Sequence, residues 1–153
     1  MRVNRKKQLK PNVEYVTPAG YKYTTDAKGR IATVEAKLDY GLASRNAYAQ
    51  RQAGGPDRLP TDDGGHLIAS IFKGSGDIDN LVPMNANINR GEYKKLEYVW
   101  AQALRRDPPE TVEVKIKPLY RGGSKRPERF QIQYSIGNGS LRTVNLKNRK
   151  EVK

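Results

Sequence analysis

The chain has 153 residues, no cysteine, a single histidine and a formal net charge of +13. The absence of cysteine excludes disulfides, thiolate metal sites and cysteine nucleophiles, and one histidine excludes sites built from two imidazoles. The positive charge indicates a polyanionic partner, with nucleic acid first and an anionic membrane second. No apolar run approaches the roughly 18 residues of a membrane-spanning helix, so no membrane span is expected.

The composition predicts three parts, namely a flexible basic arm over residues 1–12, one domain over residues 13–146 and a charged tail over residues 147–153. The central part is long enough to bury a core of its own. The N-terminus lacks the apolar stretch of a secretion signal, so export would depend on another segment or a partner.

The first part of the domain is expected to form short strands. β-branched and aromatic residues lie between turn signals at residues 13–17, 21–25 and 30–38, which is typical of a meander or hairpin. Residues 42–53 have helix-forming composition with Ser44 as a candidate N-cap. A loop is then expected up to the histidine.

The strongest helix signal covers residues 89–106, after an extended piece at residues 80–84. Residues 66–71, which precede that extended piece, are expected to form a buried strand or an ordered turn. One face of the helix is apolar at helical spacing, and Asp107-Pro108 ends it. The residues of this face, expected in the core, are Tyr93, Leu96, Trp100, Ala103 and Leu104.

Two alternating strands follow at residues 111–120 and 129–136, joined by a basic hairpin loop, and a short strand is expected at residues 141–146. The predicted fold class is therefore α+β, with a small antiparallel sheet and one long amphipathic helix. The basic loop fits either a solvated hairpin or a phosphate-contacting segment.

Residues 62–97 concentrate the reactive side chains. A neutral imidazole such as that of His66 can accept a proton at working pH. Because the chain has no cysteine and one histidine, any metal must bind amide or carboxylate oxygens and water, which favours Mg²⁺. Asn85 and Asn87 are interpreted as loop and capping residues, and Asp62 as a turn residue.

The segment Asp63-Gly64-Gly65-His66 resembles the D-R-G-H motif of the DNA/RNA non-specific endonucleases, which belong to the ββα-metal (His-Me finger) superfamily. The spacing of Asn80, Asn89 and Glu97 agrees with the order of polar residues in that family. The pattern Y-x-Y-T-x-D-x-x-G-R at residues 21–30 also resembles C-terminal nuclease domains of secreted bacterial polymorphic toxins. The resemblance implies a ββα-metal core that cleaves DNA, and also RNA, with Mg²⁺ or alternatively Mn²⁺.

The resemblance also implies a role for each matching residue. His66 would be the general base, and Asp63 would fix the loop that presents it. Asn80 would orient His66 or contact the phosphate. Asn89 would bind the metal directly, and Glu97 would reach it through water.

Helix geometry constrains this ligand set. Eight residues of continuous α-helix rise about 12 Å, so Asn89 and Glu97 cannot both be direct ligands from one straight helix. Either Asn89 precedes the helix or Glu97 acts through water, and Glu92 is the nearby rival.

The chain departs from the motif at Gly64, where the family has an arginine that helps bind the substrate. Either another cation replaces it or activity is lower, and the candidate cations are Arg58, Arg90 and Lys94, with Lys73 also nearby. This departure supports an alternative, a non-catalytic basic nucleic-acid-binding protein whose nuclease motif has decayed.

The toxin resemblance implies a nuclease that is secreted or delivered into target cells and held in the producer cytoplasm before export. Such domains have an inhibitory immunity protein, and a charge of +13 favours an acidic one. Binding to a membrane surface has little support, because no segment is both basic and strongly amphipathic.

Overall fold

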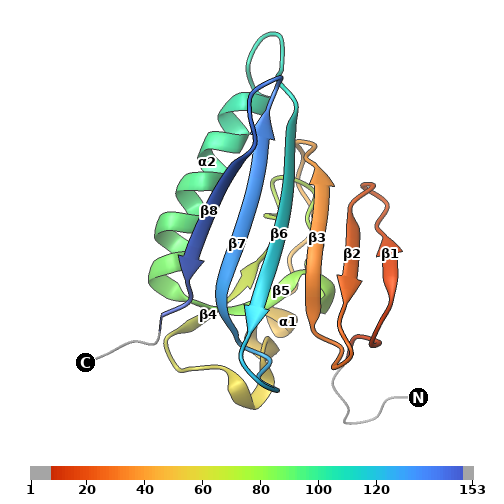
Figure 1. Ribbon diagram of the computed structural model, residues 1–153, viewed down its shortest axis with the longest axis vertical. Coiled ribbons are helices and arrows are strands. Elements are labelled where there is room, and N and C mark those ends of the chain that lie inside the picture. The colour runs from red at the N-terminus through yellow and green to blue at the C-terminus, as the bar shows by residue number, and fades with distance from the viewer. Residues whose placement is uncertain (1–7, 150–153) are drawn as a thin grey trace.

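A six-stranded antiparallel sheet forms one layer of the domain (Figure 1). The computed structural model describes residues 8–149. The strand order is β1-β2-β3-β6-β7-β8. The strands are β1 Glu14–Val16, β2 Lys22–Thr25, β3 Ile31–Lys37, β6 Val112–Tyr120, β7 Pro127–Ile136 and β8 Arg142–Lys147. The predicted strands and the antiparallel sheet are confirmed.

The remaining elements form a second unit beside this sheet. They are α1 Ala47–Gln52, η1 Gly55–Asp57, β4 Asp62–His66, η2 Ile78–Asn80, β5 Leu81–Asn85, the π-helical turn η3 Ile88–Glu92 and α2 Tyr93–Leu104. The β4–β5 hairpin followed by η3 and α2 is a ββα arrangement (Figure 1), which confirms the predicted fold class. Within residues 8–149, no helix has the length and apolar content needed to cross a membrane.

The core lies between α2 and the large sheet. Trp100 packs edge-on against Tyr134 of β7, with ring centroids 5.6 Å apart, and Tyr93 packs in the same way against Phe130 at 6.1 Å. Such pairs add to the stabilisation from buried apolar area. The expectation that Trp100 and Tyr93 belong to the core is confirmed, and α2 is thereby fixed along β7.

Two local predictions are corrected. Residues 62–66 form strand β4 rather than the end of a loop, paired with β5 so that Gly64 faces Pro83. Glycine and proline both disfavour strands, so local sequence did not indicate this pairing. Helix α1 is shorter than predicted, and Asn46 rather than Ser44 caps it, since its side-chain oxygen accepts the N–H of Ala49 at 3.0 Å.

The long helix begins before residue 89. The side-chain oxygen of Asn85 accepts the N–H groups of Asn87 and Ile88, which confirms Asn85 as a capping residue. The N–H of Tyr93 bonds to the carbonyl of Ile88, five residues earlier, so η3 is a π turn at the start of α2. The helix ends at Leu104 rather than 106.

The basic arm and the charged tail lie partly outside the described residues. Inside them, the hydroxyl of Thr25 donates to the carbonyl of Lys10 at 2.6 Å. The N–H of Asn12 donates to the carbonyl of Asp26 at 3.0 Å. Asn148 is buried directly after β8. The described fold therefore extends beyond residues 13–146 at both ends, because these segments hydrogen bond to the sheet.

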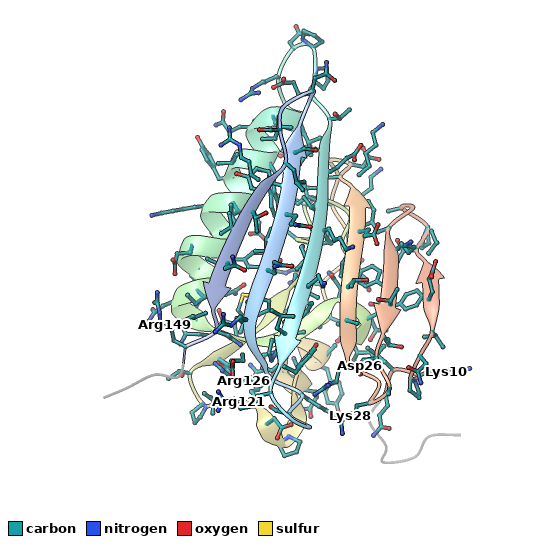
Figure 2. All side chains as sticks on the ribbon, viewed as in Figure 1. Lys10, Asp26, Lys28, Arg121, Arg126 and Arg149 are labelled. Atoms are coloured by element: carbon teal, nitrogen blue, oxygen red, sulfur yellow. The ribbon has the colours of Figure 1, made fainter. Side chains whose placement is uncertain are left out.

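A buried ion pair joins the two sheets. Arg126 donates from Nε and Nη2 to the two carboxylate oxygens of Asp62, at 2.7 and 2.8 Å. The side chains are 8% and 0% exposed. The prediction of Asp62 as a turn residue is confirmed, since its N–H donates to the carbonyl of Leu59 and its Oδ2 accepts the N–H of Leu59, both at 3.0 Å. The same carboxylate also holds Arg126 of the basic loop in the interior. Figure 2 shows Arg126 at the same end of the large sheet as Arg121 and Arg149.

Asn148 extends this contact to β5. Its Nδ2 donates to the carbonyl of Pro83 at 3.0 Å, and its Oδ1 accepts the N–H of Asn85 at 2.7 Å. Its own carbonyl accepts from Arg126 at 2.8 Å. The segment after β8 thus holds the β4–β5 hairpin against the end of the large sheet.

Replacing Arg126 with alanine should destabilise the domain by about 3–5 kcal/mol, because the carboxylate of Asp62 would stay buried without a compensating charge, with only the N–H of Leu59 as a donor. Urea unfolding near pH 7 measures the change. Arg121→Ala is the matched control, since its partner Glu128 and its own side chain are exposed, and it should cost less than about 1 kcal/mol. Equal losses of stability in the two variants would contradict a structural role for the Asp62–Arg126 ion pair.

Candidate active site

His66 ends β4 and is the buried centre of the site. Its Nε2 is buried and has no hydrogen-bond partner among residues 8–149. Burial, and secondly the positive charge of Arg45, lower the pKa of His66 to about 4. The imidazole is therefore neutral near pH 7 and can accept a proton. A buried polar atom without a partner is uncommon, and it marks a place where water or a ligand can bind.

Asp63 orients a second group of the site. The Nδ2 of Asn89 donates to Oδ2 of Asp63 at 2.9 Å, and Arg90 donates to Oδ1 at 2.7 Å. Partial burial opposes ionisation, but these hydrogen bonds lower the pKa of Asp63. Because Asn89 directs its nitrogen toward Asp63, its Oδ1 is left as an acceptor. The expected loop-fixing role of Asp63 is revised, since its carboxylate holds the helix instead.

The π turn brings Asn89 and Glu97 to one side of the helix. In a regular α-helix, eight residues turn about 800°, which leaves the two side chains about 80° apart. A π turn absorbs one extra residue, so the rotation about the helix axis from Asn89 to Glu97 is about 700°. This is within about 20° of two full turns. Both residues line the same cleft. Asn89 thus lies inside the helical run, and the remaining alternative for Glu97 is contact through water.

The cleft has a volume of about 740 Å³. It brings together four of the five residues predicted to be catalytic or metal-binding, namely His66, Asp63, Asn89 and Glu97. Burial raises the pKa of Glu97 to about 7, against the charges of Lys94 and Arg45, which lower it. The rival Glu92 does not line the cleft, and its Oε1 lies 3.5 Å from Nη2 of Arg149.

Asn80 does not reach the cleft. Its side chain is fully buried; Oδ1 accepts from the hydroxyl of Tyr23 at 2.7 Å and from the N–H of Ile68 at 3.0 Å. Its Nδ2 donates to the carbonyls of Ile68 and Ser75. The expected contact with phosphate is therefore wrong, because no part of the side chain is open to a ligand. Asn80 instead anchors the segment that follows His66.

Six cationic side chains line the cleft. Arg58, Arg90 and Lys94 were expected there, whereas Lys73 lies outside and pairs with Asp39 at 2.8 Å. The three that sequence reasoning missed are Arg45, Arg51 and Arg105. Arg105 could have been found from its helical spacing to Lys94, but the other two come from around α1, whose packing has no sequence signal.

Comparison with known proteins identifies the family of this chain. A model of the DNA/RNA non-specific endonuclease family matches residues 11–138. The chain belongs to that family. It is 46% identical over 147 residues to the type VII secretion system protein EssD of Staphylococcus aureus, covering 92% of this chain and 24% of EssD. The chain therefore spans about a quarter of that relative.

A second relative, the probable deoxyribonuclease RhsA of Dickeya dadantii, is 27% identical over 110 residues, covering 72% of this chain and 7% of RhsA. Among solved structures, the Sda1 nuclease with a bound zinc ion has a TM-score of 0.54 at 23% identity, covering 58% of this chain and 39% of that one. An extracellular endonuclease has a TM-score of 0.55 at 20% identity, covering 90% and 83%. These structures share the fold.

The absence of the motif arginine from this chain has a steric explanation. A Cβ on Gly64 would lie 2.1 Å from the backbone oxygen of Gln50, because α1 packs directly on β4. Arg58 donates to that same oxygen, and to the carbonyl of Asp62 at 3.1 Å. A guanidinium therefore lies beside Gly64, but it comes from the preceding loop.

The cleft suits a hard divalent cation. Among residues 8–149, no three or more His, Cys, Asp or Glu side chains converge on a metal position. The oxygen donors are instead Oδ1 of Asn89 and the carboxylate of Glu97. A Cβ on Gly65 would lie 2.9 Å from Cβ of Met84 and 3.2 Å from Oδ1 of Asn89, so only glycine lets β4 approach both side chains this closely. Few protein oxygens with room for water fit Mg²⁺.

Restoring the family arginine through Gly64→Arg should destabilise the fold by about 3 kcal/mol or more, because Gln50 cannot move without displacing α1. Thermal melting monitored by circular dichroism measures the change. Gly91→Arg is the matched control, since a Cβ there meets nothing within 4 Å. A Gly64→Arg variant as stable as the control would contradict the packing of α1 on β4.

Proposed function

We propose that this chain hydrolyses phosphodiester bonds of DNA, and also of RNA, with His66 as the general base and Mg²⁺, or alternatively Mn²⁺, as the cofactor. The observation that carries the proposal is the neutral, buried imidazole of His66 in one cleft with Asn89 Oδ1 and Glu97. Membership of the endonuclease family supports the same reaction.

His66 would take the proton of the attacking water. Its lowered pKa keeps the imidazole unprotonated near pH 7, and its burial limits competing contacts with bulk water. Asn80 keeps the backbone after His66 in place through its bonds to Ile68. We infer that it acts as a positioning residue.

Asn89 would hold the cation directly through Oδ1, and Glu97 would reach it through water. The cation would supply charge neutralisation at the phosphate and at the departing 3′ oxygen. Asp63 maintains the orientation of the Asn89 amide. The ion pair of Asp63 with Arg90 keeps a guanidinium at the cleft edge.

Arg58, Arg90 and Lys94 would bind the phosphates of the substrate, with Arg58 closest to the place of the motif arginine. Contacts of this kind go to the backbone and carry little sequence information. The alternative of a decayed, non-catalytic binding protein rested on Gly64. Its support weakens, because Gly64 accommodates α1 and Arg58 lies beside it.

His66→Ala should reduce plasmid degradation by at least about 100-fold, since general-base catalysis contributes about that much or more. Agarose gels with Mg²⁺ measure the loss, and circular dichroism verifies the fold. EDTA should stop the wild-type reaction. Full activity of the variant would refute the general base, and cleavage in EDTA would refute the cation. Retardation of plasmid without cleavage by the wild type would favour the binding protein.

Glu97→Gln tests the acid of the site through stability. The folded-state pKa of Glu97 lies above its ordinary value of 4.5, so wild-type stability falls as pH rises through about 4.5 to 7. The glutamine variant lacks this loss. In EDTA, the Tm advantage of the variant should be larger near pH 8 than near pH 4, by about 3 °C or more.

Mg²⁺ provides the second half of this test. Near pH 8, added Mg²⁺ should raise the Tm of the wild type more than that of Glu97→Gln, because only the carboxylate carries a charge. An equal rise in both proteins would remove Glu97 from the cation site.

We further propose that the chain is the toxin part of a secreted antibacterial effector. Its similarity to EssD, whose name places it with a type VII secretion system, and to RhsA supports delivery into target cells. The producer would hold it in the cytoplasm before export, together with an acidic immunity protein.

Expression in a bacterial cytoplasm should stop growth for the wild type and not for His66→Ala. Harmless expression of the wild type would contradict the toxin role.

A further inference from the structure

One face of α2 continues the cleft away from His66. Lys94, Tyr98, Ala101 and Arg105 follow one another at intervals of four, three and four residues, so they lie on one side of the helix, and all four line the cleft. Between Lys94 and Arg105 the helix rises about 17 Å. The cleft is therefore longer than the group of catalytic residues requires.

Two tyrosines on this path are exposed. Tyr98 and Tyr40 retain 65% and 47% of their accessible surface although both line the cleft. The hydroxyl of Tyr98 accepts a hydrogen bond from Gln102 at 2.6 Å. The ring of Tyr40 packs edge-on to Phe72, and the Arg105 guanidinium lies 5.7 Å from its centroid. Each tyrosine thus has a contact within the protein, while much of its ring surface faces solvent.

The charge around these rings identifies the occupant. Arg45, Arg51, Lys94 and Arg105 line the same cleft, which favours a polyanion over an apolar peptide or lipid. Aromatic rings that alternate with cations are typical of surfaces that bind single-stranded nucleic acid, where bases stack on the rings and cations contact the phosphates. Bases within a duplex stack on one another and leave no face for a tyrosine.

We propose that this face of α2, together with Tyr40, is a track for unpaired nucleotides next to the phosphate that is cut, with a base stacked on Tyr98. The track rests on the proposed nuclease function, and it makes single-stranded or frayed DNA and RNA the preferred substrates. Because every base has a π face, stacking keeps the enzyme tolerant of sequence.

The test measures binding in the His66→Ala background, so that cleavage does not interfere. Probes are a fluorescein-labelled 12-nucleotide thymidine strand, the same strand with abasic positions, and a hairpin duplex, each followed by fluorescence anisotropy. Adding Tyr98→Ala should weaken binding of the thymidine strand by about 5-fold or more. Binding of the abasic strand and the duplex should change by less than about 2-fold. Tyr98→Phe should restore the affinity.

Tyr48→Ala is the matched control. Tyr48 is also an exposed tyrosine, but it lies on α1 and lines a different cavity of about 640 Å³, so its loss should leave all three affinities unchanged. Equal weakening of the thymidine and abasic strands by Tyr98→Ala, or no weakening at all, would overturn the track. Weakening by Tyr48→Ala equal to that by Tyr98→Ala would also overturn it.

The outcomes for the track and for the nuclease are separable. If the wild type cleaves plasmid but Tyr98→Ala binds the thymidine strand normally, the track alone is refuted. If Tyr98→Ala weakens that binding while the wild type fails to cleave, the track stands and the nuclease function fails.

Discussion

The site depends on the buried ion pair between Asp62 and Arg126. It fixes one end of the β4–β5 hairpin to the large sheet, and Asn148 ties β5 to the same place. Asp63, the next residue, points its carboxylate to the helix and holds Asn89. Two adjacent aspartates therefore locate the hairpin between sheet and helix, and His66 at the end of β4 takes its position from that placement.

Burial then tunes the two titratable groups in opposite directions. It lowers the pKa of His66 and raises that of Glu97, so both favour their neutral forms without a bound cation. The charge of Arg45 also lowers the pKa of His66, while Lys94 and Arg45 act against burial and favour ionised Glu97. Perturbed groups of this kind cluster at functional sites.

Departures from expected patterns in this fold have local physical causes. Gly64 replaces the motif arginine because α1 crosses the position that a side chain would occupy. The π turn at Ile88–Glu92 rotates Asn89 onto the side of Glu97, which regular α-helical spacing would not allow. Beyond Asn89 and Glu97, the cleft continues along the exposed Tyr98 to Arg105. Small changes in backbone geometry thus determine which side chains share the cleft.

The sequence by itself determined the family and most of the regular elements. The D-G-G-H segment ending at His66, the spacing to Asn89 and the net charge indicated the endonuclease family, and apolar periodicity predicted α2 and the outer strands. Only the tertiary structure decided that Asp62 pairs with Arg126, 64 positions away, and that Asn80 is closed to substrate. Periodicity reports which face of an element is buried, whereas these contacts depend on how distant elements pack together.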